Sequence, residues 1–115
     1  MLKINTDTIL AQIESALEKK DVNAAIRFLA ALRIPDQADI FYELDEDDRI
    51  ALLPFLNPSV SADILEEMED RDAADLVSAL DSESANRIVD EMEPDEAADL
   101  IGDIDDEQAE MILAG

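Results

Sequence analysis

The feature that most constrains the fold of this chain is a repeat of twelve residues, which runs from Ala38 to Ala114 without insertion or deletion. Seven segments, which begin at residues 38, 50, 62, 74, 86, 98 and 110, place their apolar side chains in the same columns. The third position holds Ile40, Leu52, Ile64, Leu76, Ile88, Leu100 and Ile112. The fourth holds Phe41, Leu53, Leu65, Val77, Val89, Ile101 and Leu113. The seventh holds Leu44, Leu56, Met68, Leu80, Met92 and Ile104, and the twelfth is small from Ser61 onward.

Within one helix these columns fall at i, i+3, i+4 and i+7, which is the spacing of a single apolar stripe on an α-helix. A short fixed period also indicates units that cannot bury their stripes alone and must therefore cover one another. The chain is predicted to be all-α, a superhelical stack of short helical hairpins with about nine helices and no strand. The predicted core includes Leu76, Val77, Leu80, Ile88, Val89, Leu100 and Ile101.

Each repeat also carries a signal for the start of its helix. The eighth position is a cap former or an acid in every repeat, and proline follows it as Pro58 and Pro94. Proline at the first helical position loses no hydrogen bond, so this order predicts helix starts there. The repeats at Asp105 and Glu93 resemble a capping box with a carboxylate as the cap. We expect helices of about nine to eleven residues, joined by turns of one or two residues.

The predicted organisation is a single domain that covers residues 1–115. Residues 1–34 are expected to form two longer helices, the first roughly from Thr6 to Lys19 and the second from a cap at Asp21. Pro35 interrupts the chain, and residues 35–115 form the twelve-residue helical repeats.

The charge of the chain is strongly acidic and unevenly distributed. With 31 acidic and 8 basic residues, the formal net charge is −23. Residues 1–33 have a net charge of +1, whereas residues 34–115 have −24 and carry no basic residue after Arg87. Such a surface repels nucleic acids and anionic membranes, and it attracts cations or a basic partner.

Several functional classes are disfavoured by composition. The chain has no cysteine and no histidine, and its two glycines cannot build a phosphate-binding loop. No apolar run approaches 18 residues, so we expect no membrane span in this segment. General acid–base catalysis needs carboxylates in a water-poor pocket, which thin repeats do not provide, so we expect no enzymatic activity and no catalytic residue.

Acidic residues recur at the second position of the repeat, as Asp39, Asp63, Asp75 and Asp99. Most such residues keep an apolar solenoid soluble. Asp95, Asp99 and Asp103, however, form one row at intervals of four, where like charges are unfavourable unless a cation lies between them. Because every available ligand is a hard oxygen, the row favours Mg²⁺ or Ca²⁺, and a largely hydrated ion held by few carboxylates is the mode of Mg²⁺.

Four segments carry a family resemblance: 35–44 (PDQADIFYEL), 48–53 (DRIALL), 62–68 (ADILEEM) and 94–100 (PDEAADL). Together with the period and the acidity, they resemble the N-terminal domain of the MgtE magnesium transporters. The resemblance implies a regulatory domain on the cytoplasmic side of the membrane, next to CBS domains of the same chain, in a homodimeric membrane protein. It implies that Mg²⁺ bridges the acidic faces and favours the closed state, and it places the metal-facing acids at Asp63, Asp95 and Asp99.

A second hypothesis belongs to another class. The flagellar motor switch protein FliG also stacks short helical hairpins, and helical solenoids commonly bind proteins along one face. Under this hypothesis the chain is an interaction scaffold, and its acidity serves a basic protein partner.

Overall fold

The computed structural model describes residues 6–114 and contains α-helices joined by short turns. The helices are α1 (Thr6–Glu18), α2 (Val22–Ala30), α3 (Ile34–Glu43), α4 (Glu46–Leu52), α5 (Pro58–Glu67), α6 (Asp70–Ser78), α7 (Ser82–Asp90), α8 (Pro94–Gly102) and α9 (Asp106–Ala114), with a 3-10 turn, η1 (Leu53–Phe55), after α4. No strand occurs between residues 6 and 114, so the predicted all-α class and the number of about nine helices are confirmed.

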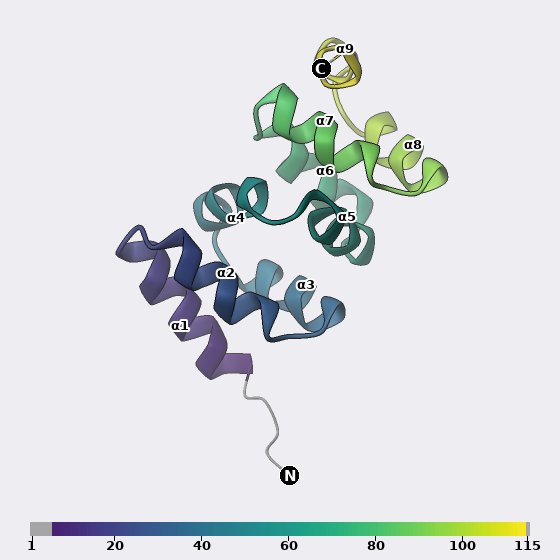
Figure 1. The fold of residues 1–115 in the computed structure, drawn as a ribbon. Helices are drawn as coiled ribbons and strands as arrows, with labels where there is room; N and C mark the ends of the chain where they lie inside the picture. The colour runs from purple at the N-terminus through teal and green to yellow at the C-terminus, as the bar shows by residue number, and fades with distance from the viewer. Residues whose placement is uncertain (1–5, 115) are drawn as a thin grey trace.

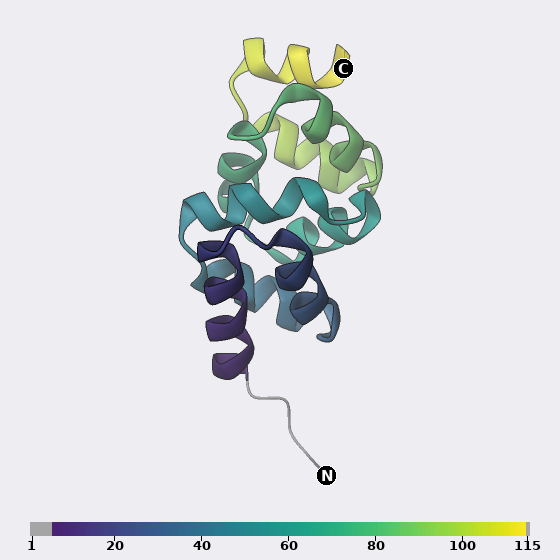
Figure 2. The ribbon, with the colours of Figure 1, turned by 60° about the vertical axis from the view of Figure 1, so that its left-hand side comes forward.

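The helices stack in two interleaved columns, each helix packing on the one two places further along the chain. One column is α1, α3, α5, α7 and α9, and the other is α2, α4, α6 and α8. Figures 1 and 2 show the resulting rod, with α1 and α2 at one end and α9 at the other. Its extents are 45 × 29 × 20 Å. The structural unit is therefore a hairpin made of two repeats, as expected for stacked repeats that bury each other's stripes.

The apolar columns of the sequence form one continuous core. All residues of the third and seventh columns are buried. The fourth column is buried from Phe41 to Val89, but Ile101 is half-buried and Leu113 is 62 % exposed. The predicted core residues are thus buried except Ile101, which lies on α8, and the column of α8 has no later helix in the described chain to cover it.

Only the Asp and Asn residues at these helix starts act as side-chain caps, whereas the Glu residues do not. The side chains of Asp21, Asp45, Asn57 and Asp81 each accept a hydrogen bond from a backbone N–H of the first turn, at 2.9–3.1 Å. Glu69 and Glu93 stand at the same position and make no such bond, so the capping box predicted at Glu93 is wrong. The short side chains of Asp and Asn suit the geometry of a cap, and Glu carries one more methylene group.

At both glutamate positions, the backbone N–H of the glutamate itself donates to a side chain of an earlier helix. The Glu69 N–H donates to the Tyr42 hydroxyl at 2.7 Å, and the Glu93 N–H donates to Glu66 Oε2 at 2.9 Å. Each pair is separated by 27 residues, and Tyr42 and Glu66 occupy equivalent repeat positions. These two bonds therefore tie successive hairpins together at matching places.

Three features differ from the predicted outline. Only α1, with 13 residues, is longer than the repeat helices, because α2 has nine. The turns between repeat helices contain two or three residues instead of one or two. Helix α4 is the shortest, with seven residues, and Pro54 follows it within the 3-10 turn, because proline has no N–H to continue the helical ladder.

Arg49 occupies the repeat position that is small in every later repeat. Its guanidinium is half-buried and caps the end of α3, donating from Nε to the carbonyls of Phe41 and Leu44 and from Nη2 to that of Tyr42. A cation at a helix C-terminus satisfies carbonyls that have no partner within the helix. One of the three arginines in residues 34–115 thus has its charge directed into the fold.

Candidate metal-binding surface

The three acids predicted to face a metal are all on the surface. Asp63 lies on α5, Asp95 in the first turn of α8, and Asp99 one turn further along α8; each is exposed. The predicted exposure of Asp95 and Asp99 is confirmed. Asp103, the third acid of the predicted row, lies just beyond the end of α8 and is also exposed.

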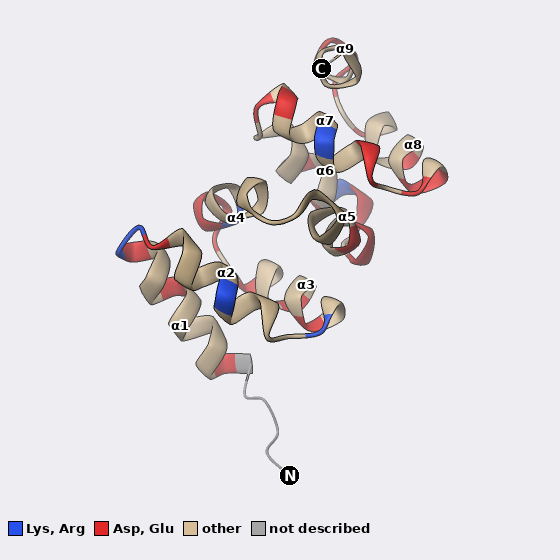
Figure 3. Ribbon diagram, viewed as in Figure 1, with Lys and Arg blue, Asp and Glu red and all other residues tan. Residues whose placement is uncertain are grey.

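The structure brings Asp95 and Asp99 together with acids of two other helices around Glu96. We call Glu66, Asp70, Asp95, Glu96 and Asp99 the α8 acid cluster. Burial raises the pKa of the Glu96 carboxyl, and the charges of Asp95, Asp70, Glu66 and Asp99 raise it further, in that order. Figure 3 shows acidic segments of α5 and α8 on the same side of the stack. The cluster is therefore a region of concentrated negative potential.

Glu66 is the member of the cluster with a defined anchor. It is half-buried at the end of α5, and its carboxylate accepts the hydrogen bond from the Glu93 N–H, immediately before α8. The bond holds a carboxylate of α5 beside the start of α8, where the helix dipole favours a negative charge. Asp63 stands one turn earlier on α5, and Glu66 is the acid of α5 among the charges that raise the pKa of Glu96.

The sequence pattern did not predict that Glu66, Asp70 and Glu96 belong to this acidic site. The three come from α5, α6 and α8, and their proximity depends on which helices stack together. The only available indication was indirect, because stacking of every second helix brings the fifth position of one repeat beside a helix start two repeats later.

The cluster offers the oxygen ligands that Mg²⁺ prefers, but it does not form a complete site. Among the side chains that the structure describes, no three Asp, Glu, His or Cys residues converge closely enough to hold a metal ion. A single ion at this surface would therefore contact at most one or two of these carboxylates directly.

A second group of acids surrounds Asp48, near the other end of the rod. Burial raises the pKa of Asp48, and the charges of Asp45, Glu14, Asp47 and Glu18 raise it further, in that order. Here Asp45 already serves as the cap of α4, accepting from the Asp48 N–H at 2.9 Å. The capping role of Asp45 therefore explains why one of the acids of this group is present.

The fold and the acid distribution define a class: a domain of stacked helical hairpins with an exposed, repelling carboxylate surface. The model of the family described as the MgtE intracellular N domain matches residues 32–115, and the chain belongs to this family.

A solved structure shares the fold. The crystal structure of the soluble part of a magnesium transporter matches with a TM-score of 0.51 at 22 % sequence identity, over 96 % of this chain and 48 % of that one. The chain thus spans about half the length of that structure. The comparison of this chain with curated proteins found no match. None of the helices between residues 6 and 114 has the length and apolar character needed to cross a bilayer.

Proposed function

We propose that this chain is the cytosolic, Mg²⁺-sensing regulatory domain of a magnesium transporter or channel, in which Mg²⁺ bridges its acidic face to adjacent CBS domains and favours the closed state. The observation that carries the proposal is the α8 acid cluster, a set of exposed and half-buried carboxylates that repel one another, on a member of the MgtE intracellular N domain family. The fold likeness to the soluble part of a magnesium transporter supports it. The role is regulatory, not enzymatic, and the parent protein is a homodimer in the cell membrane.

The mechanism follows from charge. Residues 34–115 have a net charge of −24, so a neighbouring acidic domain is repelled when divalent cations are scarce. Two unit charges about 4 Å apart interact by roughly 1 kcal/mol in water and by about 4 kcal/mol at an effective dielectric constant of 20. A few bridging ions can therefore supply the roughly 5.5 kcal/mol that reverses a 1:99 population of open and closed states.

In this proposal, Asp95 and Asp99 contact the hydrated ion through single carboxylates or through its water shell, and Asp63 does so from α5. Glu66 and Glu96 increase the local potential behind them. The isolated domain binds Mg²⁺ weakly, because an ion held by one or two carboxylates needs a partner surface to complete its shell.

The test uses the full-length parent protein and measures protection from a protease as a function of Mg²⁺ concentration. The double variant Asp95→Asn/Asp99→Asn, and Asp63→Asn separately, are expected to need more Mg²⁺ for the same protection. Asp47→Asn is the matched control, because Asp47 is also an exposed aspartate but lies outside the α8 acid cluster. If the first two curves superimpose on that of the parent while Asp47→Asn shifts, these acids are not the site.

A simpler measurement on the 115-residue chain separates binding from screening. Both Na⁺ and Mg²⁺ are expected to raise the melting temperature by screening the acidic surface. At matched ionic strength Mg²⁺ should raise it more, because it occupies the α8 acid cluster as well. Equal effects of the two salts would reduce Mg²⁺ to a screening ion and would favour the scaffold hypothesis.

The scaffold hypothesis has one observation in its favour. From Ile88 to Gly115 every charged residue is acidic, and this acidity extends beyond the α8 acid cluster onto α9. A basic protein partner would use that whole region, whereas an ion bridge needs only a few carboxylates.

A further inference from the structure

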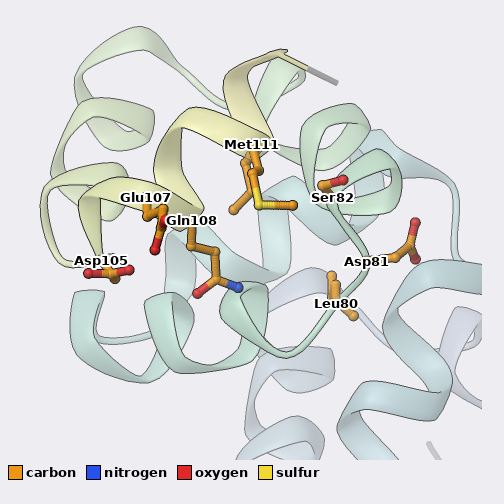
Figure 4. Close-up of a pocket in the computed structure, with 8 residues that line it drawn as sticks. Leu80, Asp81, Ser82, Asp105, Glu107, Gln108 and Met111 are labelled. Atoms are coloured by element: carbon orange, nitrogen blue, oxygen red, sulfur yellow. The ribbon is translucent and has the colours of Figure 1, made fainter.

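A groove of about 460 Å³ lies between α9 and the turn that joins α6 to α7. Its apolar lining is Leu80, Met111 and Ile112, and the acidic residues Asp81, Asp105 and Glu107 also line it. Figure 4 shows Met111 and Gln108 projecting from α9 towards the side of Leu80, Asp81 and Ser82. The groove thus combines an apolar surface with acidic neighbours.

Met111 departs from the pattern of its own repeat position. The second position is exposed in every repeat, and it holds Asp39, Ala51, Asp63, Asp75, Arg87 and Asp99 before Met111. A charge there keeps the solenoid soluble, yet Met111 places a thioether with 60 % exposure at the same position. Methionine is flexible and polarizable, and it is used on protein surfaces that accept apolar side chains.

The groove is held in place by contacts on the inner side of α9. Ala109 and Ile112 are buried against the stack. The Gln108 side chain donates to the Ser78 carbonyl, and the Asn86 side chain donates to the Ile112 carbonyl at 2.7 Å. Because these bonds fix α9 against α6 and α7, the exposed Met111 lies on a positioned helix, and the groove is preformed.

We propose that this groove binds an amphipathic helix of a protein partner, with an apolar stripe flanked by lysine or arginine. The apolar stripe would lie against the exposed Met111, with the buried Leu80 and Ile112 forming the floor of the groove, and the basic flanks would face Asp81, Asp105 and Glu107. Helices that dock into such grooves do so through apolar anchors at helical spacing, and complementary charge fixes their orientation. The α8 acid cluster takes no part in this surface, and the inference does not rest on the sensing of Mg²⁺.

Leu113 provides a matched control for Met111. The two residues are exposed to nearly the same extent, 62 % and 60 %, and they lie two positions apart on α9. Two positions correspond to about 200° around a helix, so they project from opposite flanks. Leu113 does not line the groove. The substitutions Met111→Glu and Leu113→Glu therefore add the same charge at equal exposure, one inside the groove and one outside it.

The experiment titrates the 115-residue chain into a fluorescent 14-residue peptide of leucine and lysine in amphipathic order, with a peptide of scrambled order and the same composition as the reference. The parent chain is expected to bind the amphipathic peptide on the order of tenfold more tightly, which is about 1.4 kcal/mol. Met111→Glu should remove this preference, and Leu113→Glu should retain it. Circular dichroism and a thermal midpoint establish that both variants fold.

Two results would overturn the inference. If the two peptides bind the parent chain equally well, the acidic region acts only as a diffuse field. If sedimentation shows that the chain forms dimers that Met111→Glu dissociates and the amphipathic peptide does not, the groove is occupied by a second copy of the chain.

Discussion

The same repeat position is buried in the interior of the stack and exposed at its C-terminal end. Leu53 and Leu113 both occupy the fourth column, yet Leu53 is completely buried and Leu113 is 62 % exposed. The interior position is covered by later helices of the stack, whereas none follows α9 in the described chain. In a solenoid, burial is therefore decided by the neighbour two helices away as much as by the residue itself.

Helix starts within the stack also differ in how they are stabilised. Asn57 and Glu93 are each followed by proline, at Pro58 and Pro94, so the two helix starts are otherwise closely matched. Asn57 caps α5 through its side chain, whereas the Glu93 side chain makes no cap and the Glu93 N–H donates to the Glu66 carboxylate. Local capping stabilises the start of α5, whereas a long-range contact is made at the start of α8, as it is at the start of α6.

The largest expected contrast concerns the fourth column. Leu53→Ala should lower the free energy of unfolding by about 2–5 kcal/mol, because it leaves a cavity in the core. Leu113→Ala should change it by less than about 0.5 kcal/mol, because the side chain is already in water. Urea unfolding followed by circular dichroism measures both. Equal losses would mean that α9 has a covering partner under the conditions of the measurement.

A smaller contrast is expected at the helix starts. Asn57→Ala should cost about 1 kcal/mol of stability, since the backbone N–H of Ser59 loses its acceptor. Glu93→Ala should cost less, because its side chain accepts nothing in the first turn, and it also removes one negative charge from an acidic region. The same unfolding experiment applies. A loss at Glu93 as large as that at Asn57 would show that the carboxylate caps α8 after all.

The smallest expected effect is a dependence on pH. The pKa of Glu96 is raised in the folded state, so its protonation favours folding, and this contribution is lost as the pH rises from the ordinary value of a glutamate through the folded-state value. The melting temperature should therefore fall with rising pH in that range, and Glu96→Gln should flatten the decline. Asp48→Asn should act in the same direction at the other end of the rod.

Glu110→Gln serves as the reference for this measurement, because it removes the same kind of charge from α9, outside the α8 acid cluster. If Glu96→Gln and Glu110→Gln have the same slope of melting temperature against pH, the potential is diffuse and Glu96 has no special position. Asp81 should show the opposite dependence on pH. Hydrogen bonds from Ser84 lower its pKa, so its contribution to the stability of the fold is lost as the pH falls.

The sequence was sufficient for the architecture because each apolar column maps to one helix face. The burial of the third column, from Ile40 to Ile112, follows directly from the period. The period could not show which helices stack together, so the contacts of Glu66 with α8 and of Gln108 with α6 remained hidden. For the same reason Asp95 and Asp99 were identified but their neighbours Asp70 and Glu96 were not. Which residues of different helices lie close together depends on which helices stack, and the repeat pattern does not show that.

The pairing of every second helix also determines how the length of this rod can be changed. Tyr42 and Glu66 perform the same task 24 residues apart, so the interchangeable module contains two repeats. Removal of 24 residues from the interior would delete a whole hairpin and leave both columns intact, giving a shorter folded rod. Removal of 12 residues would transfer every later helix to the opposite column and would separate contacts such as that of Glu66 with Glu93 from their partners. Evolution and design can therefore lengthen or shorten this domain only in steps of a hairpin.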